Sequence, residues 1–343
     1  MRAAVMYGAG DVRVEDRPDP KIVKPSDAVV RVVASCVCGS DLWPYGSMPA
    51  TGTGRPMGHE FLGVVEETGA DVTGLTAGDL VVAPFTYSDN TCDYCAKGLQ
   101  ISCRSGGRYG FDGVDGGQGE AVRVPYADGT LVKLPVAADS ALLPSLLALS
   151  DVMTTGHHGA VTAGVARGDT VLVVGDGAVG LCAVIAAQRL GAERIVLAGR
   201  HEARTGLGRE FGATDVVAER GEEGVARIRE LTGGGVDKVI EAVGTRQALD
   251  TALGAVLDGG TISRLGVPQY EQGPVGPAEF MRNITLTGGA SPARAYIPEL
   301  LADVLDGTIT PGRVFDESFT LDRTPDAYRA MADRRVLKAL IRP

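Results

Sequence analysis

The sequence predicts an α/β protein of two domains, one built on a doubly wound parallel sheet and the other rich in β-strands. Its 343 residues exceed what one hydrophobic core usually organises, so two domains are expected. From Thr170 onward, short apolar runs alternate with helical segments, as in βαβ units. Before that point, β-rich runs alternate with Gly, Pro and Asp turns.

The second half of the chain carries the signal for the parallel sheet. Its apolar, β-rich runs predict strands at 171–174, 195–198, 216–217, 238–242 and 260–265. Helices are predicted between them at 181–190, 224–231 and 246–257. A strand followed by a helix and another strand places the two strands parallel, so we expect a doubly wound sheet.

The remaining segments predict a β-rich domain with a helical tail. Strands are expected at 29–33, 63–66 and 120–124, and the Gly- and Asp-rich stretch 106–119 is predicted to be an ordered loop because apolar residues interrupt it. The tail predicts helices at 297–305 and 325–332 and a closing strand at 336–341 that returns to the first domain. We therefore predict one domain from 1–152 and 289–343 and a second from 153–288.

Composition limits the classes of function. The chain is 44% hydrophobic and 22% charged, which is typical of a globular protein. Its formal net charge of -10, with no block rich in Lys and Arg, argues against nucleic acid or a membrane surface as a partner. The absence of a signal peptide or a long apolar stretch predicts a cytoplasmic protein. In that compartment six cysteines serve as metal ligands or spare thiols rather than as a disulfide framework.

A glycine motif lies directly after the predicted strand 171–174. Gly175, Gly177 and Gly180 form the pattern G-x-G-x-x-G, with Ala178 and Val179 between the last two glycines. In a βαβ unit these glycines allow a tight turn, close approach of a pyrophosphate and close helix packing, while the helix N-terminus donates N–H groups. The motif predicts a Rossmann-type dinucleotide site, in preference to a glycine turn that binds nothing.

The end of the next predicted strand bears on the choice of dinucleotide. NAD-selective sites normally place Asp or Glu about 20 residues after the glycine motif, where it accepts a hydrogen bond from the ribose 2′-hydroxyl. Gly199 stands at that position here, and Arg200 and Arg204 follow it. Arginine side chains can pair with a 2′-phosphate. The sequence therefore predicts NADP, with NAD as the alternative if the arginines only begin a solvated helix.

A second group of residues has the composition of a catalytic metal site. Cys38 and Asp41 lie on one side of a loop, and His59 and Glu60 lie on the other. Catalytic zinc takes three protein ligands from thiolate, imidazole and carboxylate groups and keeps one position open. These residue types are suitable, although the spacing alone is only moderately specific.

The candidate ligands His59 and Glu60 lie in a short segment that glycines flank. The segment reads Gly58-His59-Glu60-Phe61-Leu62-Gly63 and is followed by Gly69 and Val72. The segment resembles the zinc signature of the zinc-containing medium-chain dehydrogenase/reductase family, typified by the alcohol dehydrogenases. The resemblance covers essentially the whole chain. It implies a GroES-like catalytic domain beside the Rossmann domain, and a homodimer or homotetramer that acts on a small alcohol, aldehyde or ketone. Trp43 and Tyr45, if they line the pocket, would suit a hydrophobic substrate.

The resemblance also implies a ligand set for the catalytic zinc. Cys38 and His59 match two ligands, and Asp151 falls where many members have Cys and others Asp. Asp41 and Glu60 would then be neighbours of the ligands, one orienting His59 and the other visiting the metal during ligand exchange. The alternatives are a helix N-cap for Asp151 and an ordinary loop histidine for His59.

A second, structural zinc is implied by the segment from Asp89 to Cys103. The family pattern has four cysteines, and Cys92, Cys95 and Cys103 match its last three positions. Asp89 replaces the first, and carboxylate is a competent zinc ligand. If the site were empty, Cys92 and Cys95 would be a redox-labile pair instead.

By the same resemblance, zinc polarises the substrate oxygen and Ser40 takes the alcohol proton toward the cofactor ribose. Many members end this relay with a histidine, but Trp43 stands there, so the relay must finish differently. Trp43 and Tyr45 are either an aromatic wall of the substrate pocket or ordinary packing residues. Three further residues match positions near the nicotinamide: Thr155, Leu265 and Val267.

Two other functions use the same fold. A zinc-free quinone or enoyl reductase would reduce its substrate without a metal, and a nucleotide-binding protein could keep the fold without turnover. Cys38, Ser40 and His59 together favour the zinc-dependent alcohol dehydrogenase over both.

Overall fold

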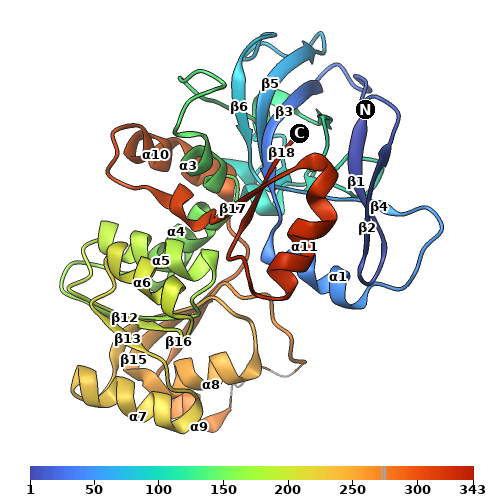
Figure 1. Cartoon of the computed structure of the whole chain (residues 1–343). Helices are drawn as coiled ribbons and strands as arrows, with labels where there is room; N and C mark the ends of the chain where they lie inside the picture. The colour runs from blue at the N-terminus through green and yellow to red at the C-terminus, as the bar shows by residue number, and fades with distance from the viewer. Residues whose placement is uncertain (272, 274–275) are drawn as a thin grey trace. The chain divides into compact units, whose positions relative to one another are not determined.

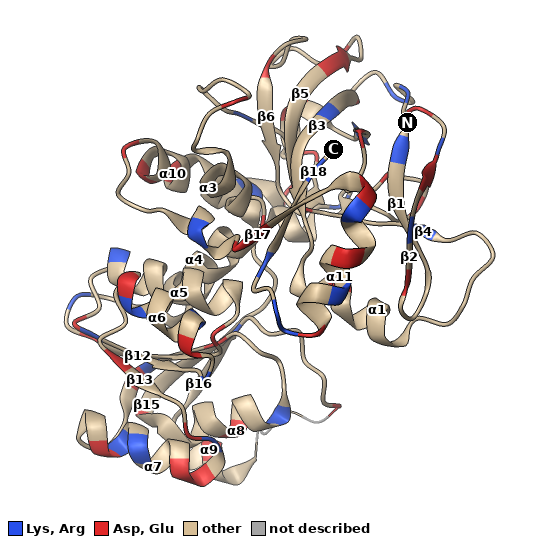
Figure 2. Ribbon diagram, in the orientation of Figure 1, with Lys and Arg blue, Asp and Glu red and all other residues tan. Residues whose placement is uncertain are grey.

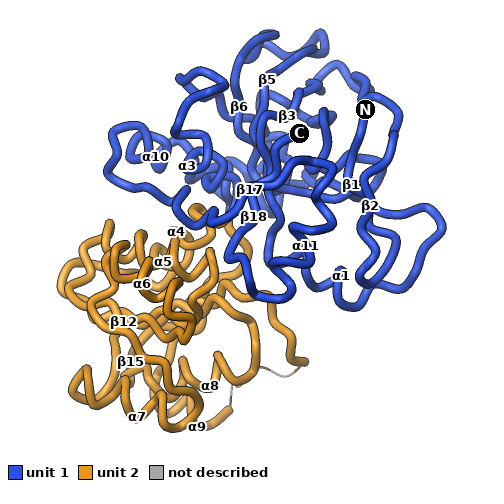
Figure 3. The backbone as a smooth tube through the Cα atoms, in the orientation of Figure 1, with its two compact units in different colours: residues 1–151, 292–343 blue, residues 152–291 orange. Residues whose placement is uncertain are grey.

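The computed structural model describes residues 1–271, 273 and 276–343. The chain forms two compact units (Figure 3). Unit 1 consists of Met1–Asp151 and Pro292–Pro343, and unit 2 consists of Val152–Ser291. Unit 1 is thus assembled from two stretches of chain that are separated by the whole of unit 2.

Unit 2 contains a six-stranded sheet in the order β13-β12-β11-β14-β15-β16. Its strands are β11 (Thr170–Val174), β12 (Arg194–Ala198), β13 (Asp215–Val217), β14 (Val236–Glu241), β15 (Val256–Arg264) and β16 (Thr285–Gly288). Its helices are α4 (Val152–Ala163), α5 (Ala178–Arg189), α6 (Glu202–Glu210), α7 (Gly221–Thr232), α8 (Arg246–Ala255) and α9 (Pro277–Met281). Every neighbouring pair of strands is parallel, which confirms the predicted doubly wound sheet (Figure 1).

The middle of this sheet is apolar because helices cover it. Val171, Leu172 and Val173 of β11 are completely buried, as strands of a parallel sheet are when both faces are covered. Helix α5, which begins directly after the glycine motif, is buried along most of its length and contacts α4, β11 and β12. The glycine loop therefore stands between a rigid strand and a rigid helix.

Helix α8 ends earlier than the sequence predicted. The pattern indicated a helix over 246–257, but α8 stops at Ala255 and β15 begins at Val256, whose backbone is extended. The guanidinium of Arg282 donates to the carbonyl oxygens of Leu253 and Val256, at 2.9 and 2.5 Å. These bonds satisfy carbonyl groups that a helix end leaves unpaired. The partner is 26 residues or more away in sequence, so no local pattern revealed it.

Unit 1 contains a seven-stranded sheet with the order β10-β6-β5-β3-β18-β17, and β9 also pairs with β3. Smaller sheets join β2-β1-β4 and β7-β8. The strands are β1 (Arg2–Gly8), β2 (Asp11–Asp16), β3 (Ala28–Cys36), β4 (Arg55–Pro56), β5 (Phe61–Thr68), β6 (Leu80–Ala83), β7 (Thr86–Tyr87), β8 (Gly107–Arg108), β9 (Ala121–Val124), β10 (Val132–Lys133), β17 (Glu317–Thr320) and β18 (Ala339–Arg342). The sequence placed the closing strand at 336–341, whereas β18 starts three residues later.

The helices of unit 1 are short except for two in the C-terminal segment. They are α1 (Leu42–Ser47), α2 (Ala127–Thr130), α3 (Leu143–Ala148), α10 (Ala293–Leu305) and α11 (Thr324–Ala332), with 3-10 turns η1 (Gly39–Asp41), η2 (Cys95–Lys97), η3 (Gln100–Ser102), η4 (Pro311–Val314) and η5 (Leu321–Arg323). Strand β18 pairs antiparallel with the end of β3 through Leu340 and Ile341. This pairing brings the C-terminal segment to the strand that leads to Cys38.

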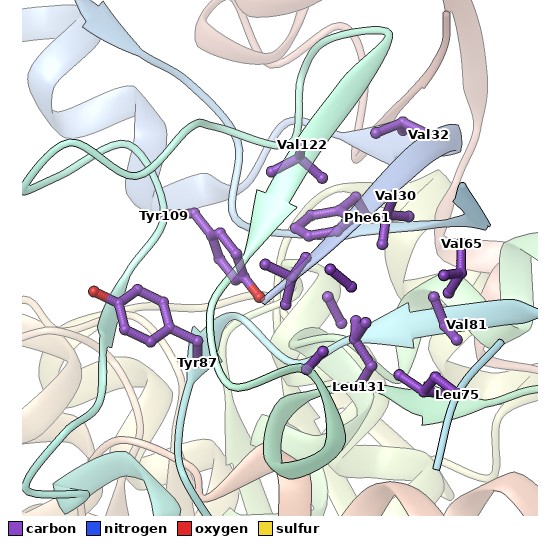
Figure 4. Packing of buried hydrophobic residues seen from close by; sticks show 14 of the residues in the cluster. Val30, Val32, Phe61, Val65, Leu75, Val81, Tyr87, Tyr109, Val122 and Leu131 are labelled. Atoms are coloured by element: carbon purple, nitrogen blue, oxygen red, sulfur yellow. The ribbon is translucent and has the colours of Figure 1, made fainter. Parts of the chain in front are cut away.

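An aromatic cluster anchors the strand that follows His59. Phe61, the first residue of β5, is fully buried and meets Tyr109 edge-on, with ring centroids 5.0 Å apart. Tyr109 in turn meets Tyr87 edge-on at 5.8 Å, and Figure 4 shows the three rings beside the aliphatic side chains of the same core. Edge-to-face pairs add to the stability that burial provides. The predicted loop 106–119 is accordingly tied to the core through Tyr109.

Residues of both charge signs occur along the chain in both units. Figure 2 shows Lys and Arg interleaved with Asp and Glu along the ribbon. Within residues 1–271, 273 and 276–343, no helix combines the length and the apolar character that crossing a bilayer requires.

Candidate functional site

Four side chains with metal-ligating atoms meet in unit 1. Ligand atoms of Cys38, His59, Glu60 and Asp151 all lie within 4.8 Å of one another. Asp151 Oδ2 lies 3.6 Å from Cys38 Sγ and 3.5 Å from His59 Nε2. Two ligand atoms that bind the same tetrahedral zinc ion are about 3.6 Å apart when they are sulfur and oxygen, and about 3.4 Å apart when they are nitrogen and oxygen. The two distances from Asp151 Oδ2 therefore fit a zinc ion shared by these three side chains.

Each residue of this cluster lies just before or after a strand or helix, which fixes the position of its backbone. Cys38 follows β3 and caps the 3-10 turn η1. His59 and Glu60 directly precede β5, whose first residue is held by the aromatic cluster. Asp151 follows α3, where Ser150 accepts a hydrogen bond at its carbonyl oxygen from the backbone N–H of Phe85. Segments far apart in the sequence thus reach one point through strand and helix termini.

Asp41 is the carboxylate beside the histidine. Its Oδ2 accepts a hydrogen bond from the backbone N–H of Cys38 at 3.1 Å, and its Oδ1 lies 3.5 Å from Nδ1 of His59. The opposite ring nitrogen of His59, Nε2, faces Asp151. A carboxylate at Nδ1 fixes the tautomer that leaves Nε2 available to a metal.

Two residues that sequence reasoning missed support Asp41. Gln118 donates from Nε2 to the carbonyl oxygen of Cys36 at 3.0 Å and to Asp41 Oδ2 at 3.5 Å. Tyr328 of α11 donates its hydroxyl to Oε1 of the same glutamine at 3.0 Å. Both side chains are completely buried. No local pattern marks them, because 210 residues separate the two partners.

The second predicted carboxylate, Glu60, has a buried lysine as its partner. Nζ of Lys338 donates to Glu60 Oε1 at 2.7 Å and to the carbonyl oxygen of Val37 at 3.3 Å. Exposure is 1% for the lysine side chain and 0% for the glutamate. Burial alone would lower the pKa of Lys338, but the neighbouring Cys36 and Glu60 outweigh it and hold that pKa well above its usual value. Among the described residues, Glu60 Oε2 has no hydrogen-bond partner, and one carboxylate oxygen of Glu60 belongs to the ligand cluster.

The predicted substrate-side residues occupy different environments. Ser40 is exposed within η1, two residues after Cys38. Trp43 is 48% exposed on α1. Tyr45 is half-buried and its ring lies 5.4 Å from that of Tyr328, and it packs against an apolar cluster that includes residues of α11 and β18. Tyr45 therefore takes part in packing, whereas Trp43 presents much of its surface to solvent.

A second cluster of ligand atoms lies in the loop that carries η2 and η3. Asp89, Cys92, Cys95 and Cys103 each offer one atom within 4.8 Å of the others. Cys92 Sγ is 3.6 Å from Cys95 Sγ and 3.9 Å from Cys103 Sγ. Two thiolates on a tetrahedral zinc are about 3.8 Å apart, far more than the length of a disulfide bond. The cluster thus fits a closed, four-ligand zinc site.

Asp89 is held in place for such a role. Its Oδ1 accepts hydrogen bonds from the backbone N–H groups of Thr91 and Cys92, at 2.8 and 3.0 Å. Burial alone would raise the pKa of Asp89, but these two donors outweigh it and lower the pKa below its usual value. The side chain is therefore ionised, as a zinc-binding carboxylate must be.

Replacing Cys92 with Ala is expected to reduce bound zinc by one ion per chain and to lower the unfolding temperature. A closed metal site stabilises a loop only while all four ligands bind, so a loss of about 2 kcal/mol, or about 4–8 °C, is expected. Metal analysis and thermal unfolding measure the two effects. The exposed Ser102→Ala, in the same loop, should change neither. Equal zinc content in the Cys92 variant and the unaltered protein would contradict this site.

The glycine motif of unit 2 has the backbone geometry of a dinucleotide loop. Gly175 has a φ of 116°, and a Cβ on Gly180 would lie 1.9 Å from the carbonyl oxygen of Gly175. A Cβ on Gly177 would have no atom within 4 Å, so this glycine faces open space. Ala178 and Val179 begin α5, and the N–H groups at the N-terminus of a helix are natural anion donors. The loop therefore fits the pyrophosphate of a dinucleotide.

A carboxylate lies at the end of β12, although the sequence placed none there. Oδ2 of Asp176 accepts hydrogen bonds from the backbone N–H groups of Arg200 and His201, both at 2.9 Å. The same oxygen lies 2.9 Å from Nδ1 of His201. A Cβ on Gly199 would stand only 2.5 Å from the Cβ of Asp176. Arg200 is exposed, and Arg204 lies one turn into α6.

The residues predicted beside the nicotinamide also belong to unit 2. Thr155 is buried on α4. Leu265 follows β15 and packs against α4, since a Cβ on Gly159 would lie 2.6 Å from its Cδ1. Val267 is 63% exposed. Leu265 and Val267 follow the carboxyl end of β15, and Thr155 lies on α4, so their place beside the nicotinamide stays a prediction.

Unit 1 holds two clusters of side chains that are suited to binding zinc, and unit 2 is a doubly wound domain with a glycine loop suited to a dinucleotide. This combination is typical of a metal-dependent dehydrogenase. Two family models match the chain in the corresponding regions. Residues 24–136 match the family model "Alcohol dehydrogenase GroES-like domain", and residues 178–306 match "Zinc-binding dehydrogenase". The chain belongs to the zinc-containing medium-chain dehydrogenase/reductase family, which confirms the predicted resemblance, and it is an oxidoreductase by that membership.

Individual relatives cover the whole chain. The zinc-type alcohol dehydrogenase B of Aspergillus flavus is 34% identical over 352 residues, which span 100% of this chain and 81% of the relative. The structure of the alcohol dehydrogenase TADH from Thermus sp. ATN1 has a TM-score of 0.92 and 33% identity, covering 100% and 99% of the two chains. A zinc-binding dehydrogenase from Sinorhizobium meliloti 1021 bound to NADP has a TM-score of 0.83 and 28% identity, covering 100% and 99%.

Proposed function

We propose that this protein is a zinc-dependent alcohol dehydrogenase that moves a hydride between a small, hydrophobic alcohol, aldehyde or ketone and a nicotinamide dinucleotide. The observation that carries the proposal is that Asp151 Oδ2 lies at tetrahedral-edge distances from both Cys38 Sγ and His59 Nε2, within one cluster of ligand atoms. Three protein ligands leave a fourth position for substrate oxygen, which is the arrangement of catalytic rather than structural zinc. Glu60 is the alternate ligand, since one of its carboxylate oxygens belongs to the same cluster and its Oε2 has no partner among the described residues.

The protein side chains around this cluster have separable tasks. When bound there, zinc supplies Lewis-acid polarisation of the substrate oxygen. Asp41 and Gln118 hold His59 in one orientation. Ser40 accepts the alcohol proton from its exposed place after Cys38. With Trp43 at the usual histidine position, the proton leaves Ser40 through water or another group, and Trp43 contributes an apolar surface to the substrate pocket.

Each unit is assigned a separate part of the proposed function. Unit 1 is proposed as the catalytic domain and unit 2 as the dinucleotide-binding domain, with Thr155, Leu265 and Val267 beside the nicotinamide. The cluster of Asp89 with three cysteines is proposed to hold the structural zinc. A homodimer or homotetramer is the assembly expected from the family resemblance.

The preference between NADP and NAD depends on charge at the end of β12. Gly199, Arg200 and Arg204 support the NADP preference predicted from the sequence, because they remove an acid and add positive charge. The relative from Sinorhizobium meliloti was solved with NADP, which is compatible with this prediction. The carboxylate of Asp176 acts against it, since a second anion repels a 2′-phosphate.

The proposed function is tested by zinc analysis together with a panel of alcohols, aldehydes and ketones and both cofactors. We expect two zinc ions per chain, and oxidation or reduction that a chelator abolishes because the catalytic ion is required. Chelator-resistant oxidation of NADPH by quinones or enones would identify a zinc-free reductase instead. Cofactor binding without turnover on the whole panel would identify a nucleotide-binding protein. Either result would overturn the proposal.

A further inference from the structure

The carboxylate of Asp176 lies where the dinucleotide loop meets the end of β12. We propose that Asp176 is a specificity-determining residue, which disfavours the 2′-phosphate of NADP(H) and shifts preference toward NAD(H). The inference rests on the proposed function, because it assumes that unit 2 binds a nicotinamide dinucleotide. It bears on the NADP prediction, which rested on Gly199 standing where NAD-selective sites have an acid.

Asp176 fills the space that a side chain at position 199 would use. A Cβ built on Gly199 would lie 2.5 Å from Asp176 Cβ and 2.9 Å from its Oδ2, so the two positions share one site. NAD-selective proteins place an acid at the end of this strand to accept from the ribose 2′-hydroxyl. Here the acid reaches the same site from the glycine loop. An acidic side chain therefore cannot simply be added at Gly199 while Asp176 is present.

Asp176 also occupies the hydrogen-bond donors that a phosphate would need. Backbone N–H groups at a helix start are natural anion donors, and the N–H groups of Arg200 and His201 directly precede α6. Both donate to Asp176 Oδ2 at 2.9 Å. A 2′-phosphate at this place would have to displace that carboxylate or bind without these donors.

The carboxylate is ionised and shielded from water. Asp176 is 8% exposed. Burial alone would raise its pKa, but the N–H groups and the imidazole of His201, with the N–H of Arg200, outweigh it and lower the pKa. A fixed negative charge with little solvent around it repels a second anion more strongly than a solvated one does. The positive charges of Arg200 and Arg204 act in the opposite sense, and the negative charge of Asp176 offsets part of their effect.

A purely structural role makes a different prediction. If Asp176 only orders the turn 199–201, its replacement would weaken NADH and NADPH alike. If Asp176 discriminates, its neutral isostere would favour NADPH selectively, because Asn keeps an acceptor for the two N–H groups and removes the charge. The ratio of the two affinities therefore separates the roles.

The experiment uses the full chain with Asp176→Asn and Asp176→Ala. Dissociation constants of NADH and NADPH are measured by nucleotide fluorescence without substrate, and those of 5′-AMP and adenosine 2′,5′-bisphosphate by calorimetry. For Asp176→Asn we expect the NADPH-to-NADH ratio of dissociation constants to fall at least about tenfold, which equals about 1.4 kcal/mol. The same direction is expected for the bisphosphate relative to 5′-AMP. Asp250→Asn removes an exposed carboxylate on α8 and should leave the ratios unchanged.

Several results would overturn the inference. An unchanged ratio in Asp176→Asn, with NADH still bound, would show that Asp176 does not discriminate, while the proposed dehydrogenase function would stand. Equal weakening of both dinucleotides would leave only the structural role. Failure of the unaltered protein to bind either dinucleotide would refute the proposed function and this inference with it.

Discussion

Replacing Asp151 with Ala is expected to remove the catalytic zinc, leave the structural zinc in place and reduce kcat/KM by roughly a thousandfold or more. Asp151 Oδ2 lies 3.6 Å from Cys38 Sγ and 3.5 Å from His59 Nε2, the separations expected between two ligands of one zinc ion. Without it, only a thiolate, an imidazole and the lysine-paired Glu60 remain. An alcohol would then lose the Lewis acid that makes its alkoxide accessible near neutral pH.

The exchange of this residue for Cys supplies the conservative control. Many members of the family have Cys at this position, so Asp151→Cys is expected to retain two zinc ions and much of the turnover. The exposed Asp139→Ala should behave as the unaltered protein. Zinc content by elemental analysis and initial rates with the best substrate of the panel are the measurements. Full zinc and full turnover in Asp151→Ala would show that the aspartate is only a loop residue.

The parts of the fold that the sequence predicted are those with local patterns. Buried strands such as Thr170–Val174 are continuous apolar runs, and their alternation with helices fixes a parallel sheet, which the structure confirms. The glycine motif is also local, because the backbone atoms that exclude a side chain at Gly180 belong to Gly175, only five residues earlier. Patterns of this kind need no knowledge of distant partners.

The parts that were missed depend on contacts between distant segments. Gln118, Tyr328 and Lys338 support the zinc cluster across sequence separations of 77 to 301 residues, and no periodicity marks such partners. Asp176 was overlooked for a different reason. It occupies a position that the G-x-G-x-x-G motif leaves free, so the proposed role rests on its bonds to Arg200 and His201, which no sequence pattern marks. The assignments of catalytic, cofactor-binding and substrate residues remain predictions until ligands are bound.

Replacing Lys338 with Met is expected to destabilise the protein by about 3–5 kcal/mol, because it leaves the carboxylate of Glu60 buried without its cation. The ammonium group and the carboxylate are 2.7 Å apart and essentially inaccessible to water. Removing one partner of such a pair costs more than the pair itself contributes, since the desolvated charge stays behind. Urea and thermal unfolding of the zinc-loaded protein measure the change.

Two further variants separate the buried charge from the loss of packing. Lys338→Met combined with Glu60→Gln removes both charges and is expected to regain most of the lost stability, because no unpaired ion remains. Lys133→Met breaks an exposed pair with Asp79, with the lysine side chain 58% exposed, and should cost less than about 1 kcal/mol. If the double variant were as unstable as Lys338→Met, the lysine would act through its packing. If Lys338→Met were as stable as the unaltered protein, Glu60 would have to be protonated or bound to the metal.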